Sequence, residues 1–152
     1  MFLTFDTETT GLPKNFKADI SDSDNWPRLV QLAWQLNDET GKLISSNSLI
    51  VKPEGFTIPF NSEKVHGIST EKALKEGEDL EGIIQKFEED LKNSKYVIGH
   101  NINFDLKIIG AEHFRLNYNS NLNDKINLDT GQISKTYCNC LLYTSPSPRD
   151  RG

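Results

Sequence analysis

The sequence predicts one α/β domain, in which helices flank a mixed sheet of three antiparallel strands followed by parallel strands. Residues 28–37 (RLVQLAWQLN) alternate between two faces, one of them fully apolar, which is typical of a strand. Residues 79–93 carry apolar side chains at the spacing of an amphipathic helix. The expected order of elements, β-β-β-α-β-α-β, places a hairpin before crossover units and therefore indicates a mixed sheet.

The first half of the chain is expected to form three strands. Residues 1–6 are a short apolar run, and residues 43–51 return beside strand 28–37 after a turn, which gives an antiparallel hairpin. The connections between these strands are rich in Gly, Pro and polar residues and are expected to be irregular: 10–27 and 53–64.

The second half combines two helices with two short strands. In helix 79–93 the acidic residues lie opposite the apolar stripe and are expected to face solvent: Glu81, Glu88, Glu89 and Asp90. Strand 96–100 is followed by a helix at 104–116, which is expected to be largely buried because its apolar residues occupy more than one face. Asn101 or Asn103 is expected to cap this helix. A loop and a last strand complete the expected order: 116–127 and 126–130.

Composition narrows the classes of function. The formal net charge of −5 argues against a DNA coat protein or a membrane-surface protein, but it is compatible with a nuclease site that binds cations. No apolar run approaches the ~18–20 residues that a membrane span requires. The two cysteines, Cys138 and Cys140, provide neither a disulfide framework nor a zinc site. These observations predict a cytoplasmic protein without membrane contact.

Three carboxylates are candidates for chemistry. Asp6 and Glu8 follow the first strand two positions apart, so their side chains share a face. Asp105 lies in the first turn of the helix after strand 96–100, where the helix dipole favours an anion. If the two strands lie parallel and adjacent, the three acids converge at the carboxyl ends of the strands. Carboxylate oxygens without cysteine ligands suit Mg²⁺ or Mn²⁺.

Three motifs occur in order along the chain. FDTETTGL contains Asp6 and Glu8, KVHGIST contains His66, and HNINFD ends at Asp105. The first and last of these match the first two motifs of the DEDD-type (DEDDh) 3′–5′ exonucleases, which the sequence therefore resembles from about residue 2 to residue 139. The middle motif is similar to a Val-His-Gly-Ile segment that is common in the epsilon proofreading subunit of bacterial DNA polymerase III.

This resemblance implies a ribonuclease-H-like fold and hydrolysis of phosphodiester bonds from a 3′ end with two Mg²⁺ (or Mn²⁺) ions. It implies that Asp6 bridges both ions, that Glu8 binds the ion that activates water, and that Asp105 supports the second ion. It also implies a set of residues that contact the terminal nucleotides: Thr9, Leu12, Asn61, His66, Asn101 and Phe104. Asn61 stands where the polymerase subunit commonly has Glu.

The third motif of the family, His-x-x-x-x-Asp, normally follows a further helical region, and no such pair follows Asp105 in this chain. Residues 140–150 (CLLYTSPSPRD) resemble the translated read-through of a sequencing adapter. We therefore expect an exonuclease domain at 1–139 that is truncated before the third motif, and a non-native disordered tail at 140–152. The chain itself is expected to be an inactive fragment with little or no hydrolysis, because the third motif supplies the general base and a fourth carboxylate.

These features together predict a metal-dependent 3′–5′ exonuclease that acts on a single-stranded or frayed 3′ end of DNA in proofreading or repair. A DNA polymerase is a candidate partner. Two alternatives stay open at this stage. An RNA-trimming exonuclease of the same superfamily shares the first two motifs, and a non-catalytic nucleic-acid-binding module would keep the fold without the third motif.

Overall fold

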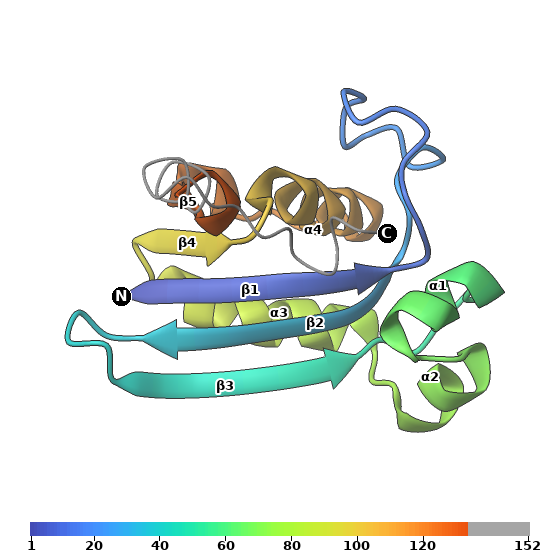
Figure 1. The fold of residues 1–152 in the computed structure, drawn as a ribbon, viewed down its shortest axis with the longest axis horizontal. Coiled ribbons are helices and arrows are strands. Elements are labelled where there is room, and N and C mark those ends of the chain that lie inside the picture. Colours follow the sequence, from blue (N-terminus) through green and yellow to red (C-terminus); the bar gives the residue numbers. More distant parts are fainter. Residues whose placement is uncertain (134–152) are drawn as a thin grey trace, which may run out of the picture.

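The computed structural model describes residues 1–133 and contains a five-stranded sheet with the strand order β3-β2-β1-β4-β5 (Figure 1). Three strands form its antiparallel half: β1 (Phe2–Thr9), β2 (Leu29–Asn37) and β3 (Leu43–Ile50). The other two run parallel to β1: β4 (Tyr96–Gly99) and β5 (Ile126–Asp129). The predicted mixed sheet is therefore confirmed, including its order of antiparallel and parallel strands.

β1 is the central strand because it pairs with β2 on one side and with β4 on the other. Phe5 lies opposite Trp34 in the antiparallel pair, and Phe2 lies opposite Tyr96 in the parallel pair. Successive side chains of a strand point to opposite faces, so one face of β1 is buried and the other is open. The buried face consists of Leu3, Phe5 and Thr7.

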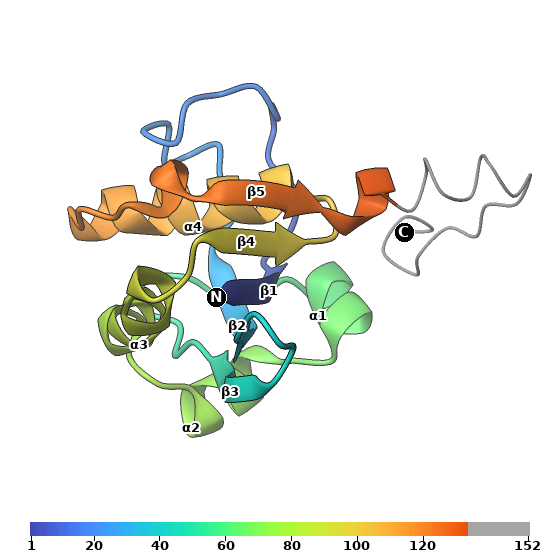
Figure 2. The same cartoon turned by 90° about the vertical axis from the view of Figure 1, so that its left-hand side faces the viewer.

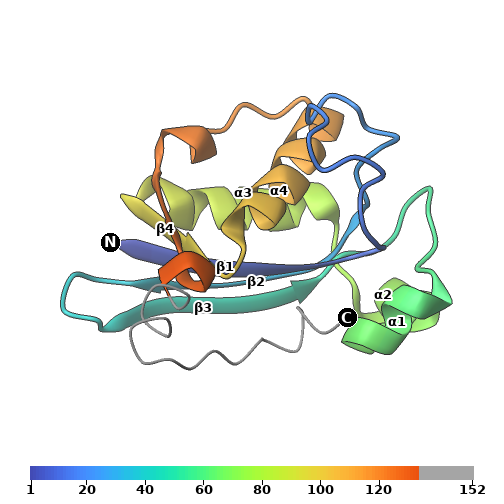
Figure 3. The same ribbon diagram turned by 45° about the horizontal axis from the view of Figure 1, so that its top comes forward.

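Helices α3 (Leu80–Lys92) and α4 (Ile102–Leu116) cover one face of the sheet, as Figures 2 and 3 show from two directions. The main hydrophobic core lies between them and the sheet. Phe87 of α3 is central to it: its ring lies 5.5 Å from the rings of both Phe5 and Trp34, tilted against the first and edge-on to the second. Such aromatic pairs add about 0.5–1.5 kcal/mol each to the burial of their apolar surface.

Two short helices lie between β3 and α3, and the sequence analysis did not predict them. α1 (Phe60–His66) and α2 (Thr70–Glu76) have seven residues each, too few for an apolar period to be recognised. α1 ends at Gly67, whose φ of 76° is readily adopted by glycine, and the Ser69 side chain caps α2 by accepting a hydrogen bond from the Lys72 backbone. The expectation of an irregular segment at 53–64 is therefore wrong for residues 60–64 and correct for residues 53–59. Both helices lie beyond the carboxyl end of β1 (Figure 1).

The predicted solvated acidic face of α3 is correct only for Glu81 and Glu89. Glu88 is 3% exposed; its carboxylate lies 2.8 Å from Nε2 of His113 on α4 and accepts a hydrogen bond from the Ser120 hydroxyl. Asp90 accepts hydrogen bonds from the Trp34 indole (2.8 Å) and from the Ser45 hydroxyl. Buried Glu88 and half-buried Asp90 therefore connect α3 to α4 and to the sheet through polar contacts.

Smaller differences concern the ends of elements. β1 continues to Thr9, and α4 begins at Ile102, two residues before the expected position. The expected loop at 116–127 contains a 3₁₀ turn (Leu122–Asp124) before β5. Within residues 1–133, none of the helices combines the length and apolar character needed to cross a membrane. The expected tail at 140–152 lies outside the described residues.

Candidate active site

Asp6 and Glu8 lie on the open face of β1, as their spacing predicts. Asp6 is exposed and Glu8 is half-buried, whereas Thr7 between them is buried on the opposite face. The register between β1 and β2 shifts between Glu8 and Thr9, which marks the point where the strand leaves the regular ladder. Neither α3 nor α4 covers this face (Figure 3). The two carboxylates are therefore accessible to a ligand that approaches the sheet from the open side.

Asp105 reaches the same strand from its buried face. It is the acid in the first turn of α4, it is 0% exposed, and its Oδ1 accepts a hydrogen bond from the Thr7 hydroxyl (2.5 Å). A hydrogen bond to the charged form and the positive end of the helix dipole both stabilise a carboxylate there. The structure thus places Asp105 against the first motif, but on the side of β1 opposite to Asp6 and Glu8.

Among residues 1–133, the carboxylates of Asp6, Glu8 and Asp105 do not form the expected cluster of metal ligands. Within residues 1–133, no three His, Cys, Asp or Glu side chains form a group that could hold a metal ion. Asp6 and Glu8 share one face, and Asp105 packs on Thr7 from the other face. The assignment of all three acids as metal ligands stays a prediction.

Asp129, which the sequence did not mark as a site residue, holds the junction between β4 and α4. Asn101 occupies the cap position of α4 in a left-handed conformation (φ 55°), and its side chain makes no capping hydrogen bond, contrary to expectation. Instead, the carboxylate of Asp129 at the end of β5 accepts hydrogen bonds from the backbone N–H groups of Asn101 (2.9 Å) and Gly131 (2.8 Å). Because Asp129 pairs with Gly99 in the parallel ladder, β5 holds the turn that precedes Asp105.

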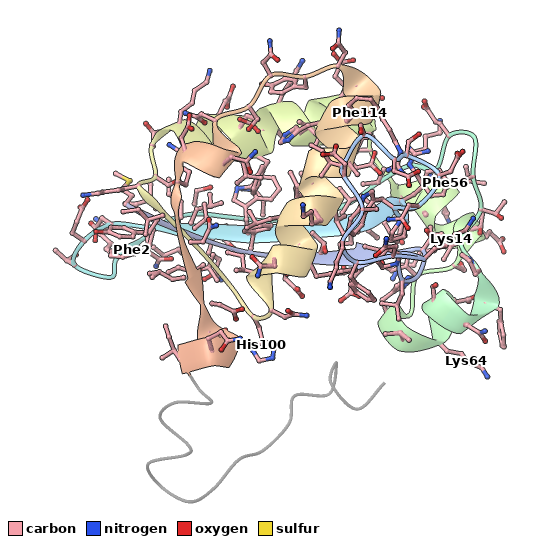
Figure 4. The ribbon with its side chains drawn as sticks, turned by 90° about the horizontal axis from the view of Figure 1, so that it is seen from above. Phe2, Lys14, Phe56, Lys64, His100 and Phe114 are labelled. Carbon is pink, nitrogen blue, oxygen red and sulfur yellow. The ribbon has the colours of Figure 1, made fainter. Side chains whose placement is uncertain are left out.

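His100 and Asp105 also have the His-x-x-x-x-Asp spacing, although both belong to the second motif. Nδ1 of His100 lies 3.5 Å from the hydroxyl of Thr130, whereas Asp105 contacts Thr7. The side chain of His100 is drawn in Figure 4 at the end of β4. Because both residues belong to the second motif, their spacing does not make them a third motif.

α1 is fixed to the end of the first motif. The Ser62 hydroxyl donates a hydrogen bond to the Thr10 carbonyl (2.6 Å), and Ser62 itself is buried. His66 at the end of α1 accepts a hydrogen bond at Nδ1 from the Ile68 backbone. Burial lowers the pKa of His66 below its usual value, and the nearby Thr9 backbone and the Glu63 carboxylate offset this effect only in part. The sequence-predicted pair of Thr9 and His66 is therefore brought together.

The remaining predicted substrate residues differ in how far they are exposed. Leu12 is 76% exposed, Asn61 on α1 is exposed, and Phe104 on α4 is half-buried with its ring centroid 6.4 Å from that of Phe16. Asn101 is exposed at the start of α4. Their contact with a nucleotide stays a prediction.

A buried charge network, which the sequence analysis missed, holds the loop after the first motif. Glu112 of α4 is fully buried and accepts hydrogen bonds from Arg28 Nε (3.0 Å) and Arg115 Nη1 (2.8 Å). Arg115 also donates to the backbone carbonyls of Ser23 and Trp26. Residues 84 positions apart in sequence meet here, and no local pattern signals such a pair. A hollow of about 440 Å³ beside the network is lined by residues that include Thr10.

Comparison with solved structures shows what fold this chain shares. It is similar to Escherichia coli Exonuclease I in complex with a 5cy-dA13 oligonucleotide, with a TM-score of 0.74 and 20% identity over 98% of this chain and 32% of that chain. The metal-free form of the Exonuclease I–single-stranded DNA complex (TM-score 0.73) and its zinc-bound form (TM-score 0.71) are each 20% identical and cover 92% of this chain and 30% of theirs. The chain therefore spans about a third of the length of these proteins.

The ribonuclease-H-like exonuclease fold expected from the motifs is confirmed by this likeness. No curated protein matches the sequence significantly. The similarity to the epsilon subunit in particular is not confirmed. A family model described as RNase T exonuclease matches residues 3–141, which include both carboxylate motifs. This match extends over most of the sequence, and the chain therefore belongs to the RNase T exonuclease family.

Proposed function

We propose that this protein belongs to the DEDD-type 3′–5′ exonucleases and that its site acts on the 3′ end of a single strand of DNA, in proofreading or repair. One observation carries the proposal: the first motif places Asp6 and Glu8 on the open face of the central strand, while the second motif anchors Asp105 to Thr7 from the other face. Family membership supports the reaction class, and the similar Exonuclease I structures include complexes with the oligonucleotides dA16 and dT13.

The residues on the open face fit divalent cations. Asp6 and Glu8 offer hard carboxylate oxygens two positions apart on one face of a strand, the donor type that Mg²⁺ and Mn²⁺ prefer. Two such ions, when bound, would lower the pKa of a coordinated water and stabilise negative charge on the phosphoryl group. Asp105 would contribute by accepting hydrogen bonds from the second side of the strand, or by binding an ion through water.

The chain's own residues would orient the terminal nucleotide. The exposed side chain of Leu12 would pack against a base, and the N–H groups of the segment from Thr9 to Leu12 would donate hydrogen bonds to the nucleotide. His66 is predominantly neutral near pH 7 because burial lowers its pKa, so it would act as a hydrogen-bonding group rather than as a fixed cation. Asn61 on α1 would contribute an amide to the sugar.

The chain as printed is proposed to have little or no activity and a cytoplasmic location. No His-x-x-x-x-Asp pair follows Asp105, and the loss of a general base alone costs a factor of about 10²–10⁴ in rate. A DNA polymerase partner belongs to the same proposal, by analogy with the proofreading subunits whose motifs the chain resembles.

The proposal is tested with a 5′-labelled single-stranded DNA oligonucleotide and excess protein in Mg²⁺ or Mn²⁺, so that slow single-turnover shortening is visible. We expect a ladder of products shortened from the 3′ end in the presence of metal, and its loss in Asp6→Asn. Glu81→Gln changes an exposed acid on α3 and is the matched control, which should shorten DNA like the wild type.

Four outcomes would contradict the proposal or one part of it. Removal of nucleotides from the 5′ end would contradict the polarity, and equal activity of Asp6→Asn would contradict the site. Faster shortening of an RNA strand of the same sequence would favour the RNA-trimming alternative. Rapid multiple turnover by the 152-residue chain would contradict only the proposed weakness of its catalysis.

A further inference from the structure

α1 presents an exposed aromatic side chain beside the candidate active site. Phe60 is 67% exposed, and Val65 on the same helix is 79% exposed. The ammonium group of Lys64, four residues after Phe60, lies 4.9 Å from the centre of the Phe60 ring. These side chains are exposed on a seven-residue helix and do not contribute to the core, so the Phe60 ring and the Lys64 ammonium are accessible together to a ligand.

The position of this pair relative to the site is fixed. The hydrogen bond from Ser62 to the Thr10 carbonyl ties α1 to the first motif, and Ser62 is buried against it. On the other side of the motif, the loop after β1 also alternates exposed apolar and cationic side chains: Leu12, Lys14, Phe16 and Lys17. Figure 4 shows Lys14 and Lys64 at the same end of the sheet. Exposed aromatic and lysine side chains therefore flank the end of β1.

We propose that Phe60 and Lys64 form a subsite for an unpaired nucleic-acid strand, in which a base stacks on the Phe60 ring and Lys64 contacts a neighbouring phosphate. This inference rests on the proposed function and adds to it a contact with the strand upstream of the 3′ terminal nucleotide. A base has an apolar face and a charged backbone, which matches an aromatic ring with a cation beside it. An apolar protein partner would bury the lysine ammonium without a counter-charge and is therefore disfavoured.

The test measures binding of a 5′-fluorescent dT12 strand by anisotropy, with the 152-residue chain in EDTA so that no hydrolysis occurs. Stacking of a base on an aromatic ring predicts that Phe60→Ala raises the Kd by about 5- to 50-fold. Removal of one phosphate contact predicts that Lys64→Ala reduces the slope of log K against log salt by about 0.7, whereas Phe60→Ala leaves that slope unchanged.

Two matched controls separate a subsite from general loss of charge or apolar surface. Phe114→Ala removes a 51% exposed aromatic side chain from the last turn of α4, and Lys42→Ala removes an exposed lysine from the β2–β3 turn at the far end of the sheet. Both controls should bind dT12 like the wild type. Circular dichroism should show that all four variants are folded, because each substitution is on the surface.

The possible results separate this inference from the function on which it rests. If the wild-type chain does not bind dT12 at low salt, the proposed function fails and the subsite fails with it. If the wild type binds and Phe60→Ala and Lys64→Ala behave like the two controls, the subsite is wrong while the function stands. Photocross-linking is an independent test: a DNA strand with 5-iodouracil at one upstream position should cross-link to Phe60. Cross-links confined to other residues would overturn the inference.

Discussion

The two faces of β1 differ although they belong to the same eight residues. Leu3, Phe5 and Thr7 point into the core, where they meet the aromatic cluster and the carboxylate of Asp105. Asp6 and Glu8 occupy the open face of the sheet. The same strand therefore packs in the core through one face and presents candidate catalytic carboxylates on the other, because successive side chains point to opposite faces.

This difference has a physical consequence for the site. A strand that pairs on both sides and is packed on one face has little freedom to move, so the carboxylates on its other face are held in place without being buried. Substitutions on the packed face should therefore change stability, whereas substitutions on the open face should change ligand binding and leave stability nearly unchanged.

Phe5→Ala should have the largest effect on stability. It removes a buried ring that packs against Phe87 at 5.5 Å, and truncation of a core Phe to Ala costs about 3–5 kcal/mol in the free energy of unfolding. Thr4→Ala, on the open face next to it, should cost less than about 1 kcal/mol. Urea unfolding followed by circular dichroism measures both. Equal losses for the two variants would show that the open face is packed as well.

Thr7→Val should have the next largest effect. The substitution keeps the shape of the side chain but removes the hydroxyl that donates to buried Asp105, and loss of a partner by a buried polar group costs about 1–3 kcal/mol, more for a charged one. Thr7→Ser keeps the hydroxyl and is the control, since it should lose only the contribution of one methyl group. Chemical denaturation measures both, and a Thr7→Val variant as stable as Thr7→Ser would contradict the importance of this hydrogen bond.

The strands and the two long helices could be predicted because their patterns are local. Residues 28–37 alternate strictly, and the apolar stripe of α3 repeats over three turns, so each segment signals its own structure. α1 and α2 could not be predicted in this way, because about two turns of helix are too short to show a period. Tertiary contacts, such as that of Ser62 with Thr10, hold α1 in place.

The candidate site was predictable in its residues but not in its geometry. The motifs named Asp6, Glu8 and Asp105, and the pairing of β1 with β4 brings the second motif beside the first, as expected. The side of the strand from which Asp105 approaches depends on the path of the turn at Asn101, which Asp129 holds from 28 residues away. The pattern of a helix start does not contain that information.

Ser62→Ala tests whether α1 depends on its connection to the first motif. The variant removes the hydrogen bond to the Thr10 carbonyl, and a net loss of about 0.5–1.5 kcal/mol in the free energy of unfolding is expected. Ser46→Ala, an exposed serine in the middle of β3, is the matched control and should change stability by less than about 0.5 kcal/mol. Thermal unfolding measures the difference, and identical melting temperatures would indicate that packing alone holds α1 in place.

The smallest effect concerns pH and involves His66, which lies where α1 meets the end of β1. Burial lowers the pKa of His66 in the folded protein below the value of 6.5 for an unperturbed histidine, so the unfolded chain binds a proton more readily. Stability should therefore rise with pH through the range between the folded pKa and 6.5, and fall as the pH is lowered through that range. The difference in unfolding free energy between wild type and His66→Gln, measured by urea titration from pH 5 to pH 8, should follow this sign. A difference that is constant over the whole range would mean that folding does not lower the pKa of His66, and that its side chain is solvated like the carboxylates on the open face of β1.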